Sequence, residues 1–323
     1  MNRKLLRSVR EYKRESILTP LLVVMEVFME VLIPLLMANI IDIGIMNGDM
    51  GYIVKTGLLL ILLAMVALVF GAKAGNLGAI ASAGYAKNLR HDIFYKIQDF
   101  SFGNIDHFST SGLVTRLTTD ITNVQMAYMF TIRLLVRAPI MIVLSLIMTL
   151  TINVKVAVMM LITIPILGGT LIFIAKKAHP HFIKVFDEYD ILNNTVQENV
   201  NAARVVKAYV RADHENEKFG KISTIVYNLF TKAEKIVAWN NPVMMFTMYV
   251  VVLVMVYIGG EDIVFGRMQT GELTSVIVYA IQILMSLMMV SFVFVMIMIA
   301  EASSDRIKEV LDEVPEMEDR ADA

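Results

Sequence analysis

The chain alternates between long apolar runs and long polar segments, and six apolar runs have the length of a membrane span. They cover approximately residues 17–37, 52–71, 134–152, 154–175, 243–260 and 274–300. A transmembrane helix needs about 20 predominantly apolar residues, so each run is long enough to cross the hydrocarbon core. The pattern therefore predicts six transmembrane helices, and the short segment TINVK allows a tight hairpin between the third and the fourth.

Two polar segments between these runs, residues 72–133 and 176–242, are rich in helix-forming residues and poor in Gly and Pro. Both are therefore expected to be helical rather than disordered. A single helix from residue 52 to about residue 99 would be roughly 70 Å long at 1.5 Å per residue. The hydrocarbon core is only about 30 Å thick, so most of the remainder must project into water. The expected fold is an all-α membrane protein: six transmembrane helices with two long cytoplasmic helical extensions.

Composition and charge agree with this fold. Hydrophobic residues make up 57% of the chain, charged residues 18%, and the mean hydropathy is +0.64. Of the 29 Lys and Arg residues, only Lys55, Lys155 and Arg267 fall in the short loops, while nearly all others lie in the N-terminal segment, the extensions and the tail. By the positive-inside rule, both termini and both extensions are expected to be cytoplasmic, in a multi-pass protein of the cell inner or plasma membrane.

Residues 1–16 combine apolar residues at helical spacing with many basic ones. Leu5, Leu6, Val9 and Tyr12 fall on one face, which predicts an amphipathic helix lying on the anionic inner leaflet. A basic leader that only sets topology is the alternative. The segment lacks the pattern of a cleavable signal peptide, because the first apolar run is span-length and has no small-residue cleavage site.

Small residues recur every four positions along the second span, and two acids lie within the first. Ala67, Gly71, Gly75, Ala79 and Ala83 form the small stripe, which predicts close helix packing. Glu26 and Glu30 are four residues apart and share one helix face. A charge at the bilayer centre costs about 3 kcal/mol, so we interpret both acids as a cavity wall that attracts cationic amphiphiles. Protonated acids hydrogen-bonded between helices, or pairing with Lys73, are the alternatives.

The sixth run is rich in methionine, a flexible side chain that suits a pocket for ligands of many shapes. Met285, Met289 and Met296 lie roughly on one face of this run, with Gln282 and Phe292 nearby, and we predict that these five residues line the substrate cavity. Gln282 lies at mid-membrane depth and needs a hydrogen-bond partner. Pro34 predicts a kink in the first span, either as part of a gate or as ordinary packing.

Two further charged pairs have the i, i+4 spacing of helix neighbours. Arg116 and Asp120 are expected to form a salt bridge on a helix surface, worth a few tenths of a kcal/mol. Arg133 and Arg137 precede the third span and are interpreted as a topology anchor at the inner headgroups.

Motifs for chemistry are missing from the sequence. There is no cysteine, and none of the five histidines has metal-ligand spacing. The Gly220–Lys221 pair lacks the rest of a P-loop. We therefore expect no catalytic residue, no metal site, no nucleic-acid partner, and neither binding nor hydrolysis of ATP by this chain.

Three stretches resemble parts of ABC exporters. IDHFSTSGLVTRLTTDITNVQ (residues 105–125) is similar to their first intracellular loop, and VQENVNAARVVKAYVRADHENEKF (196–219) to their second intracellular helix pair. SSDRIKEVLDEVPEMEDRA (303–321) resembles the linker that leads into a nucleotide-binding domain. With six spans in the matching order, the chain resembles the transmembrane domain of a type IV ABC exporter, close to bacterial multidrug or lipid half-transporters.

The resemblance implies a homodimer or heterodimer with alternating access, in which the fourth and fifth helices pack against the opposite subunit. It implies two short coupling helices, at about 102–109 and 211–219, that dock on ATP-binding domains. The residues so assigned are Phe102, Asn104, Asp106, His107, Arg211, Asp213, His214 and Phe219. Independently, Asp213 has the residue type of a helix cap and Phe219 that of an aromatic anchor. ATP and Mg would act in a nucleotide-binding domain absent from this chain, with residues 301–323 as the linker toward it.

These patterns predict the membrane-spanning part of an ATP-driven exporter for hydrophobic or amphipathic compounds such as drugs, lipids or peptides. Two alternatives stay open. Glu26 and Glu30 could carry protons in a secondary transporter, or the chain could be a ligand-binding membrane module that does not transport.

Overall fold

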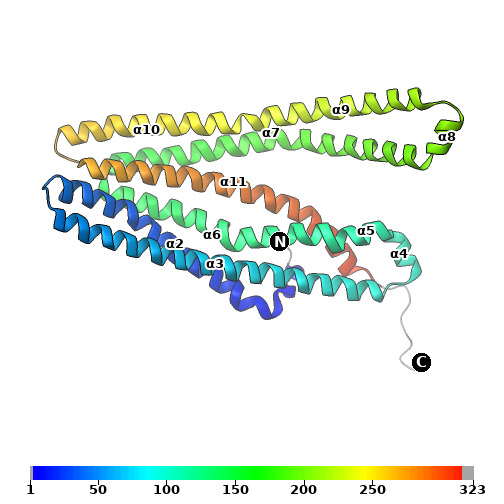
Figure 1. Ribbon diagram of the computed structural model, residues 1–323, viewed down its shortest axis with the longest axis horizontal. Helices are drawn as coiled ribbons and strands as arrows, with labels where there is room; N and C mark the ends of the chain where they lie inside the picture. The colour runs from blue at the N-terminus through cyan, green and yellow to red at the C-terminus, as the bar shows by residue number, and fades with distance from the viewer. Residues whose placement is uncertain (1–2, 315–323) are drawn as a thin grey trace. The chain divides into compact units, whose positions relative to one another are not determined.

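The computed structural model describes Arg3–Val314, and this part of the chain is built of helices joined by short turns (Figure 1). Six of its helical segments are long and apolar enough to cross a membrane. The helices fall into two compact units, one with residues 1–161 and 252–323 and the other with residues 162–251. The predicted all-α class and the six spans are confirmed. The predicted linker, 301–323, is described only as far as residue 314.

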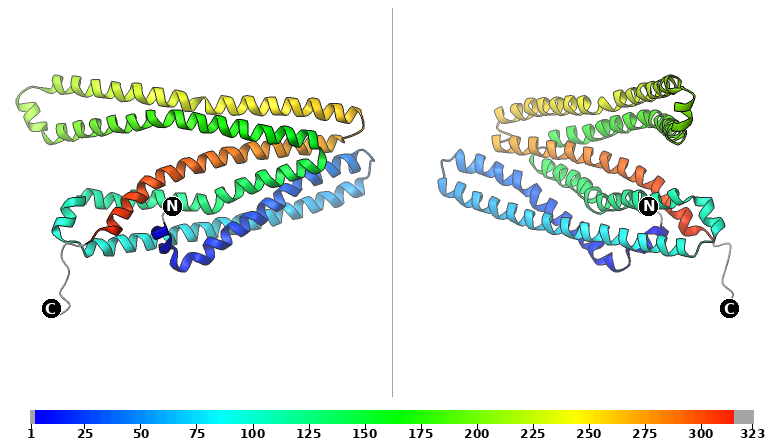
Figure 2. Two further views of the ribbon diagram at one scale, coloured as in Figure 1. Left: turned by 180° about the vertical axis from the view of Figure 1, so that it is seen from behind. Right: turned by 45° about the vertical axis from the view of Figure 1, so that its right-hand side comes forward.

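Unit 1 is a bundle of four long helices: α2 (Lys13–Asn39), α3 (Met50–Gln98), α6 (Ile121–Ile152) and α11 (Thr270–Asp312). The short helices α4 (Phe102–Phe108) and α5 (Thr110–Thr115) connect α3 to α6 (Figure 2). All four long helices contribute to one apolar core, whose members include Val27, Ala74, Met141 and Tyr279. The single helix predicted from residue 52 to about residue 99 is confirmed by α3.

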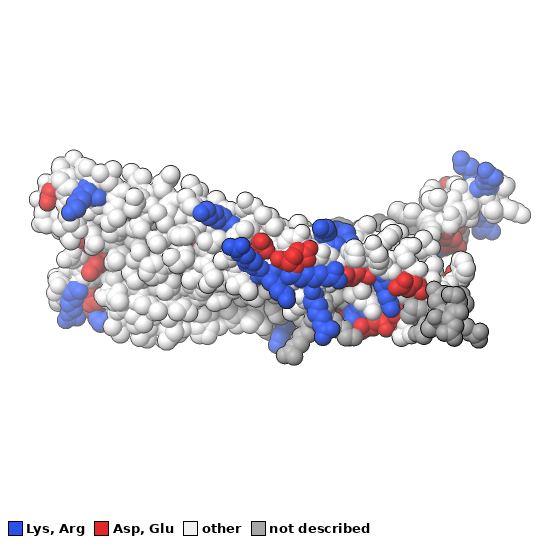
Figure 3. All heavy atoms as spheres, turned by 90° about the horizontal axis from the view of Figure 1, so that it is seen from below, with Lys and Arg blue, Asp and Glu red and all other residues white. Residues whose placement is uncertain are grey.

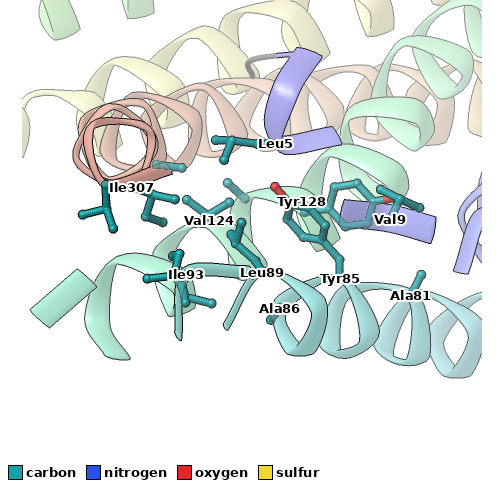
Figure 4. Close-up of a cluster of buried hydrophobic side chains, with 14 of the residues drawn as sticks. Leu5, Val9, Ala81, Tyr85, Ala86, Leu89, Ile93, Val124, Tyr128 and Ile307 are labelled. Carbon is teal, nitrogen blue, oxygen red and sulfur yellow. The ribbon is translucent and has the colours of Figure 1, made fainter. Parts of the chain in front are cut away.

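A second apolar core holds the bundle together near its α4 end (Figure 4). Leu89 and Ile93 of α3, Val124 of α6 and Ile307 of α11 are buried there. The rings of Tyr85 and Tyr128 stack beside them with centroids 4.7 Å apart, and the other buried members are Leu5, Val9, Ala81, Ala86, Phe100, Leu113, Ile121, Ala127, Ala300 and Val310. Because this core lies beyond the most apolar part of the helices, the extension remains packed where it leaves the span.

The N-terminal segment differs from the amphipathic surface helix that its sequence predicts. It forms two short turns of helix, α1 (Arg3–Leu6) and η1 (Arg7–Tyr12), with a break at Arg10, where φ is 40°. Leu5 and Val9 are buried in the protein core, whereas Leu6 stays exposed. The predicted lipid-facing stripe is therefore wrong for Leu5 and Val9.

Hydrogen bonds to α3 explain why the N-terminal segment folds back. Ser8 Oγ and Arg10 Nη2 donate to the carboxylate of Asp92 at 2.7 and 2.6 Å. Asn88 Nδ2 donates to the carbonyl oxygen of Ser8 at 3.0 Å. A Cβ at Gly84 would lie 2.3 Å from the ring of Tyr12, so only glycine lets the segment approach α3 this closely.

The packed face of α3 drifts away from the four-residue stripe seen in the sequence. Inside unit 1, this face runs through Ala67, Gly71, Ala74, Gly78 and Ala81. A step of four residues advances by about 40° more than one turn of a 3.6-residue helix, so a strict four-residue stripe leaves the face after two or three turns. Accordingly, Ala79 and Ala83 are exposed in this chain, and their predicted packing role is not met within unit 1.

At the end opposite α4, the π-helical segment η2 (Ile40–Ile45) ties α2 to α11. The carboxylate of Asp42 accepts hydrogen bonds from the backbone N–H groups of Gly271 and Glu272, at 2.6 and 3.0 Å, and so caps the first turn of α11. Further along α11, Ser275 Oγ and Tyr279 Oη donate to backbone carbonyl oxygens of α2, the former to Pro34. The helix α2 continues through Pro34.

Two of the three basic residues predicted in short loops, Lys155 and Arg267, also meet at this end of unit 1. Asp262, whose side chain is 3% exposed, accepts from Asn153 Nδ2 at 2.8 Å and from Lys155 Nζ at 3.1 Å. Arg267 lies 3.7 Å from the same carboxylate. The α6–α7 turn and the loop before α11 are therefore joined by one buried acid.

Unit 2 is a long helical hairpin built from parts of α7 (Val154–Asn201) and α10 (Asn240–Val264) together with α8 (Ala203–Ala208) and α9 (Ala212–Ala238). Phe182 and Phe230 meet edge to face across it, with ring centroids 6.2 Å apart. Near the tip, Lys218 Nζ binds Glu198 at 3.0 Å. Large apolar side chains on this unit are nevertheless exposed, among them Tyr209, Val210, Tyr227 and Trp239. The hairpin alone does not bury them.

Candidate functional site: a membrane charge cluster and the extension tips

The two acids of the first span share one arginine, which we call the charge cluster: Glu26, Glu30 and Arg137. Arg137 Nη1 donates to Glu26 Oε1 at 2.7 Å, and Nη2 donates to Glu30 Oε2 at 2.6 Å. All three side chains are largely buried, at 14, 28 and 23% exposure. The arginine therefore crosses from α6 to α2 with one branch of its fork on each acid.

This geometry revises the interpretation of Arg137. From its spacing, Arg137 is predicted with Arg133 to be a headgroup anchor, and Lys73 is one predicted partner of the acids. In the structure the partner is Arg137, whose fork is filled by carboxylates instead of lipid headgroups. Charge-assisted hydrogen bonds of this kind are among the strongest in proteins. The acids are thus held between helices, and a cationic ligand would have to compete with Arg137 for them.

Gly71 provides the space for Glu26. A Cβ at this position would lie 2.8 Å from Glu26 Oε1, so a larger residue would press on the carboxylate. The GxxxG pair of α3 therefore does more than bring two helices together, because its first glycine makes room for an ion pair at membrane depth.

The spacing of the predicted cavity residues places them along one side of α11, and their role in a substrate cavity stays a prediction. Gln282 accepts a hydrogen bond from Ser145 Oγ of α6 at 3.2 Å, which supplies the partner its depth requires. Phe292 meets Phe130 edge to face, with ring centroids 5.4 Å apart. Met285 is 62% exposed, and Met289 and Met296 are half-buried. Within unit 1, α6 contacts both groups of predicted cavity residues. Arg137 binds the two acids of α2, and Ser145 binds Gln282 of α11.

The short helix predicted at 102–109 is present as α4, with Ser101 and Asn104 forming a capping box at its start. Phe102 is 85% exposed at the tip, and Asp106 and His107 are also exposed. Asn104, in contrast, is buried. Its Nδ2 donates to Glu313 Oε1 at 2.9 Å and to the carbonyl oxygen of Val314 at 3.3 Å. Asn104 thus binds the chain beyond α11 and is not part of the exposed surface.

The second predicted short helix, 211–219, is misplaced. The short helix at the tip of unit 2 is α8, Ala203–Ala208, and Arg211 is the N-cap residue of the long returning helix α9 without a side-chain cap bond. Asp213 lies inside the first turn of α9, so its predicted capping role is wrong. The turn is made by Val210, whose φ of 53° ends the preceding helical segment. Arg211, Asp213, His214 and Phe219 are all exposed.

The predicted bridge between Arg116 and Asp120 is replaced by hydrogen bonds from each residue to α11. Asp120 is fully buried and receives the fork of Arg306, with Nε at 2.8 Å from Oδ2 and Nη2 on Oδ1. Arg116 donates through Nη2 to Glu309 Oε2 at 2.8 Å and through Nε to the carbonyl oxygen of Arg306. Asn123 Nδ2 adds a bond to Ser303 Oγ at 3.1 Å. We call this set of contacts the α11 clasp.

The clasp was missed because sequence spacing offered a nearer partner for each charge. Arg116–Asp120 forms a π-helical segment, η3, in which the i, i+4 relation of an α-helix no longer holds. The signal that could have indicated the clasp is the run of charged residues in the stretch 303–313, which follows a long apolar helix and needs partners.

Taken together, six membrane-length helices and packed helical extensions with an exposed tip define a multi-pass membrane protein of the transporter type. The family model of the ABC transporter transmembrane region matches residues 16–299. The chain therefore belongs to the ABC transporter transmembrane region family, and the resemblance to type IV ABC exporters is confirmed. Among the groups of His, Asp and Glu in the described residues, none could hold a metal ion.

Similar proteins share this class. The chain is 33% identical over 309 residues to the uncharacterised ABC transporter ATP-binding protein YfiB of Bacillus subtilis (strain 168), covering 96% of this chain and 54% of that protein. It is 28% identical to Rv1273c of Mycobacterium tuberculosis (strain ATCC 25618 / H37Rv), covering 94% and 52%. The multidrug resistance-like ATP-binding protein MdlA of Buchnera aphidicola is also 28% identical, over 94% and 53%. The chain thus spans about half the length of these relatives.

Proposed function

We propose that this chain is the substrate-translocating membrane domain of an ATP-driven exporter for hydrophobic or amphipathic compounds, working as a dimer by alternating access. The observation that carries the proposal is the well-packed extension of unit 1. In it α3, α6 and α11 continue beyond the span, share a buried core and end at α4, where Phe102 is 85% exposed. An exposed aromatic on a braced helix tip is what a docking surface for a separate motor requires.

An ATP-binding domain is the partner proposed for that tip. The matched relatives are named ATP-binding proteins and are about twice as long as the matched region, which supports a motor acting on this membrane domain. ATP and Mg would be bound by the motor. The name of the Buchnera relative, multidrug resistance-like, supports hydrophobic compounds as the cargo.

A second membrane domain is the partner proposed for unit 2. Tyr209, Tyr227 and Trp239 are exposed by 77, 68 and 66%, although the hairpin is otherwise well formed. Large apolar side chains outside lipid favour burial against another protein surface. A dimer, either of two identical chains or with a related one, would supply that surface.

The orientation that fits this function has α4, α8 and both termini in the cytoplasm. Only Lys55, Lys155 and Arg267 lie at the opposite end, as the positive-inside rule favours for the outer face. On the face drawn in Figure 3, a broad surface with few charges adjoins one where basic and acidic side chains gather, as expected for a span next to a hydrated extension.

A proton-coupled secondary transporter is the second candidate, because Glu26 and Glu30 are carboxylates at membrane depth. Their shared bond to Arg137 argues against it, since both carboxylates already bind a cation of the protein itself. A ligand-binding module that does not transport is the third. It leaves the braced tip at α4 without a role.

One transport assay separates the three. The chain is assembled with its ATP-binding domain in inverted membrane vesicles, and uptake of a fluorescent amphiphile is followed. The proposal predicts uptake that needs ATP hydrolysis and persists when a protonophore removes the pH gradient. Uptake driven by the pH gradient without ATP would instead indicate the secondary transporter, and saturable binding without uptake would indicate the module.

A further inference from the structure

We infer that Arg133 is a binding site for the anionic headgroup, a phosphate or a carboxylate, of an amphiphile that enters from the inner leaflet. The inference deepens the proposed function, on which it rests for the direction of transport, and it reverses the charge of ligand that the acids alone would suggest. It is built from the position of Arg133, from the lack of a partner, and from the way the neighbouring acids are occupied.

Arg133 of α6 packs against α3, close to Thr19 of α2. A Cβ at Gly78 would be 3.7 Å from its Cδ, and a Cβ at Gly75 would be 3.7 Å from Cζ, Nη1 and Nη2. The side chain therefore runs along α3 from Gly78 to Gly75, with its guanidinium against the glycine surface. The methyl group of Thr19 lies 3.4 Å from the same Cβ position of Gly78, so α2 also approaches α3 at this point.

The guanidinium of Arg133 has no counter-ion within the described residues. It makes neither a hydrogen bond nor an ion pair with another described residue, although it is half-buried. Arg137, one turn further along α6, has both branches of its fork filled by Glu26 and Glu30. Arg137 and Arg133 therefore differ, although they share one helix face. Arg137 is neutralised by two protein carboxylates, and the guanidinium of Arg133 can still accept an anionic partner.

The nearest acids are committed elsewhere or lie on the wrong side. Glu26 and Glu30 each bind Arg137 at 2.7 Å or less. Glu15 is one turn of α2 before Thr19, whereas the guanidinium of Arg133 points away from it, toward Gly75. A half-buried cation at the edge of the hydrocarbon region is stabilised by an anionic partner, and the described part of the chain supplies none.

The chemistry of the site selects the ligand class. A guanidinium presents a planar fork of donors that matches two oxygens of a phosphate or carboxylate. Arg133 stands directly before the apolar run that begins at Leu134, so a ligand whose headgroup binds the fork would have its tail in the hydrocarbon region. Both an exported anionic amphiphile and a phospholipid of the bilayer have this form. The tests below distinguish them.

The first test compares two probes of equal chain length, a pyrene-labelled alkyl phosphate and a pyrene-labelled alkyltrimethylammonium, on the purified chain in nanodiscs of phosphatidylcholine. Arg133→Gln is expected to weaken binding of the phosphate by about tenfold and to leave that of the ammonium unchanged. Arg133→Lys keeps the positive charge but lacks the two-branched guanidinium. Its affinity for the phosphate should lie between those of the wild type and Arg133→Gln. Because Arg133 forms no hydrogen bond or ion pair with another described residue, Arg133→Gln and Arg133→Lys should unfold close to the wild-type temperature.

Arg14→Gln is the matched control, since Arg14 is an exposed cation near the start of α2. It should leave phosphate binding unchanged. Equal weakening by Arg14→Gln and Arg133→Gln would show a general surface-charge effect and would overturn the site, as would unchanged phosphate binding in Arg133→Gln.

The second test identifies the source of the anion. Phosphatidylglycerol added to the nanodiscs displaces the alkyl phosphate from wild-type protein if the site holds a bilayer lipid. If the phosphate stays bound and the assembled transporter takes it up with ATP, the site holds the cargo. Loss of ATP-driven uptake with intact phosphate binding would refute the proposed function and leave the site standing.

Discussion

Replacing Arg137 with leucine is expected to destabilise unit 1 by about 3–5 kcal/mol, the largest effect of any single change in the membrane-spanning region. The substitution leaves Glu26 and Glu30, 14 and 28% exposed, without the cation that binds both. At membrane depth, each stranded carboxylate must either stay charged in a poor solvent or take up a proton. The unfolding transition in detergent, followed by circular dichroism, measures the loss of free energy of unfolding.

The control is a triple variant, Arg137→Leu with Glu26→Gln and Glu30→Gln, which removes all three charges together. It should recover most of the lost stability, because a neutral glutamine is far cheaper to bury than an unpaired carboxylate. If Arg137→Leu alone unfolds like the wild type, the acids are solvated. The interpretation of Glu26 and Glu30 as the wall of a wet cavity would then be favoured over the ion-paired cluster.

Replacing Arg306 with leucine is the second large effect, and it acts on the α11 clasp. Asp120 is fully buried and binds the fork of Arg306, so the change strands a carboxylate inside the protein. A loss of about 3 kcal/mol is expected, together with faster amide exchange at the end of α11. Hydrogen–deuterium exchange of the segment 303–312 measures the change in the amide exchange rate.

Glu309→Gln is the matched control for the clasp. Glu309 is 59% exposed and binds Arg116 at the surface, so its removal should cost less than about 1 kcal/mol. Equal effects of Arg306→Leu and Glu309→Gln would contradict the assignment of Asp120 as the buried centre. A second check is Arg306→Leu combined with Asp120→Asn, which should restore part of the stability.

The clasp also bears on how a motor would act on the span. Asn104 of α4 binds Glu313, and the contacts of Arg116 and Asp120 follow along α11. The tip that we propose to meet the ATP-binding domain and the helix that runs back through the membrane are therefore joined at several successive positions. A displacement of α4 would be passed to α11 directly, without a flexible segment between them.

The fold was predictable because its signals are local. Span length, helix-forming composition and the charge difference between loops and extensions are each read within a short window of sequence, and they gave the six spans and the continuous helix α3. The short helix α4 followed from the resemblance to ABC exporters, and its Ser101–Asn104 capping box is likewise a local feature.

The partners of the charged residues were not predictable, because they lie far apart in the sequence. Arg137 is 111 and 107 residues from Glu26 and Glu30, and Arg306 is 186 residues from Asp120. Helical spacing offered the nearer pair Arg116–Asp120, which the π-helical turn and α11 override. The prediction for the N-terminal segment was wrong for a similar reason. Leu5 and Val9 are buried in a protein core formed with distant residues, whereas the local pattern indicated contact with lipid.

The most direct test of alternating access is a pair of distances in the transporter assembled with its ATP-binding domains. Spin labels are placed at Met46, an exposed residue in the turn between the first two spans, and separately at Phe102 on the α4 tip, each paired with its counterpart on the second membrane domain. Trapping ATP should lengthen the distance at Met46 and shorten that at Phe102. Changes of the same sign at both sites, or none at either, would contradict the account.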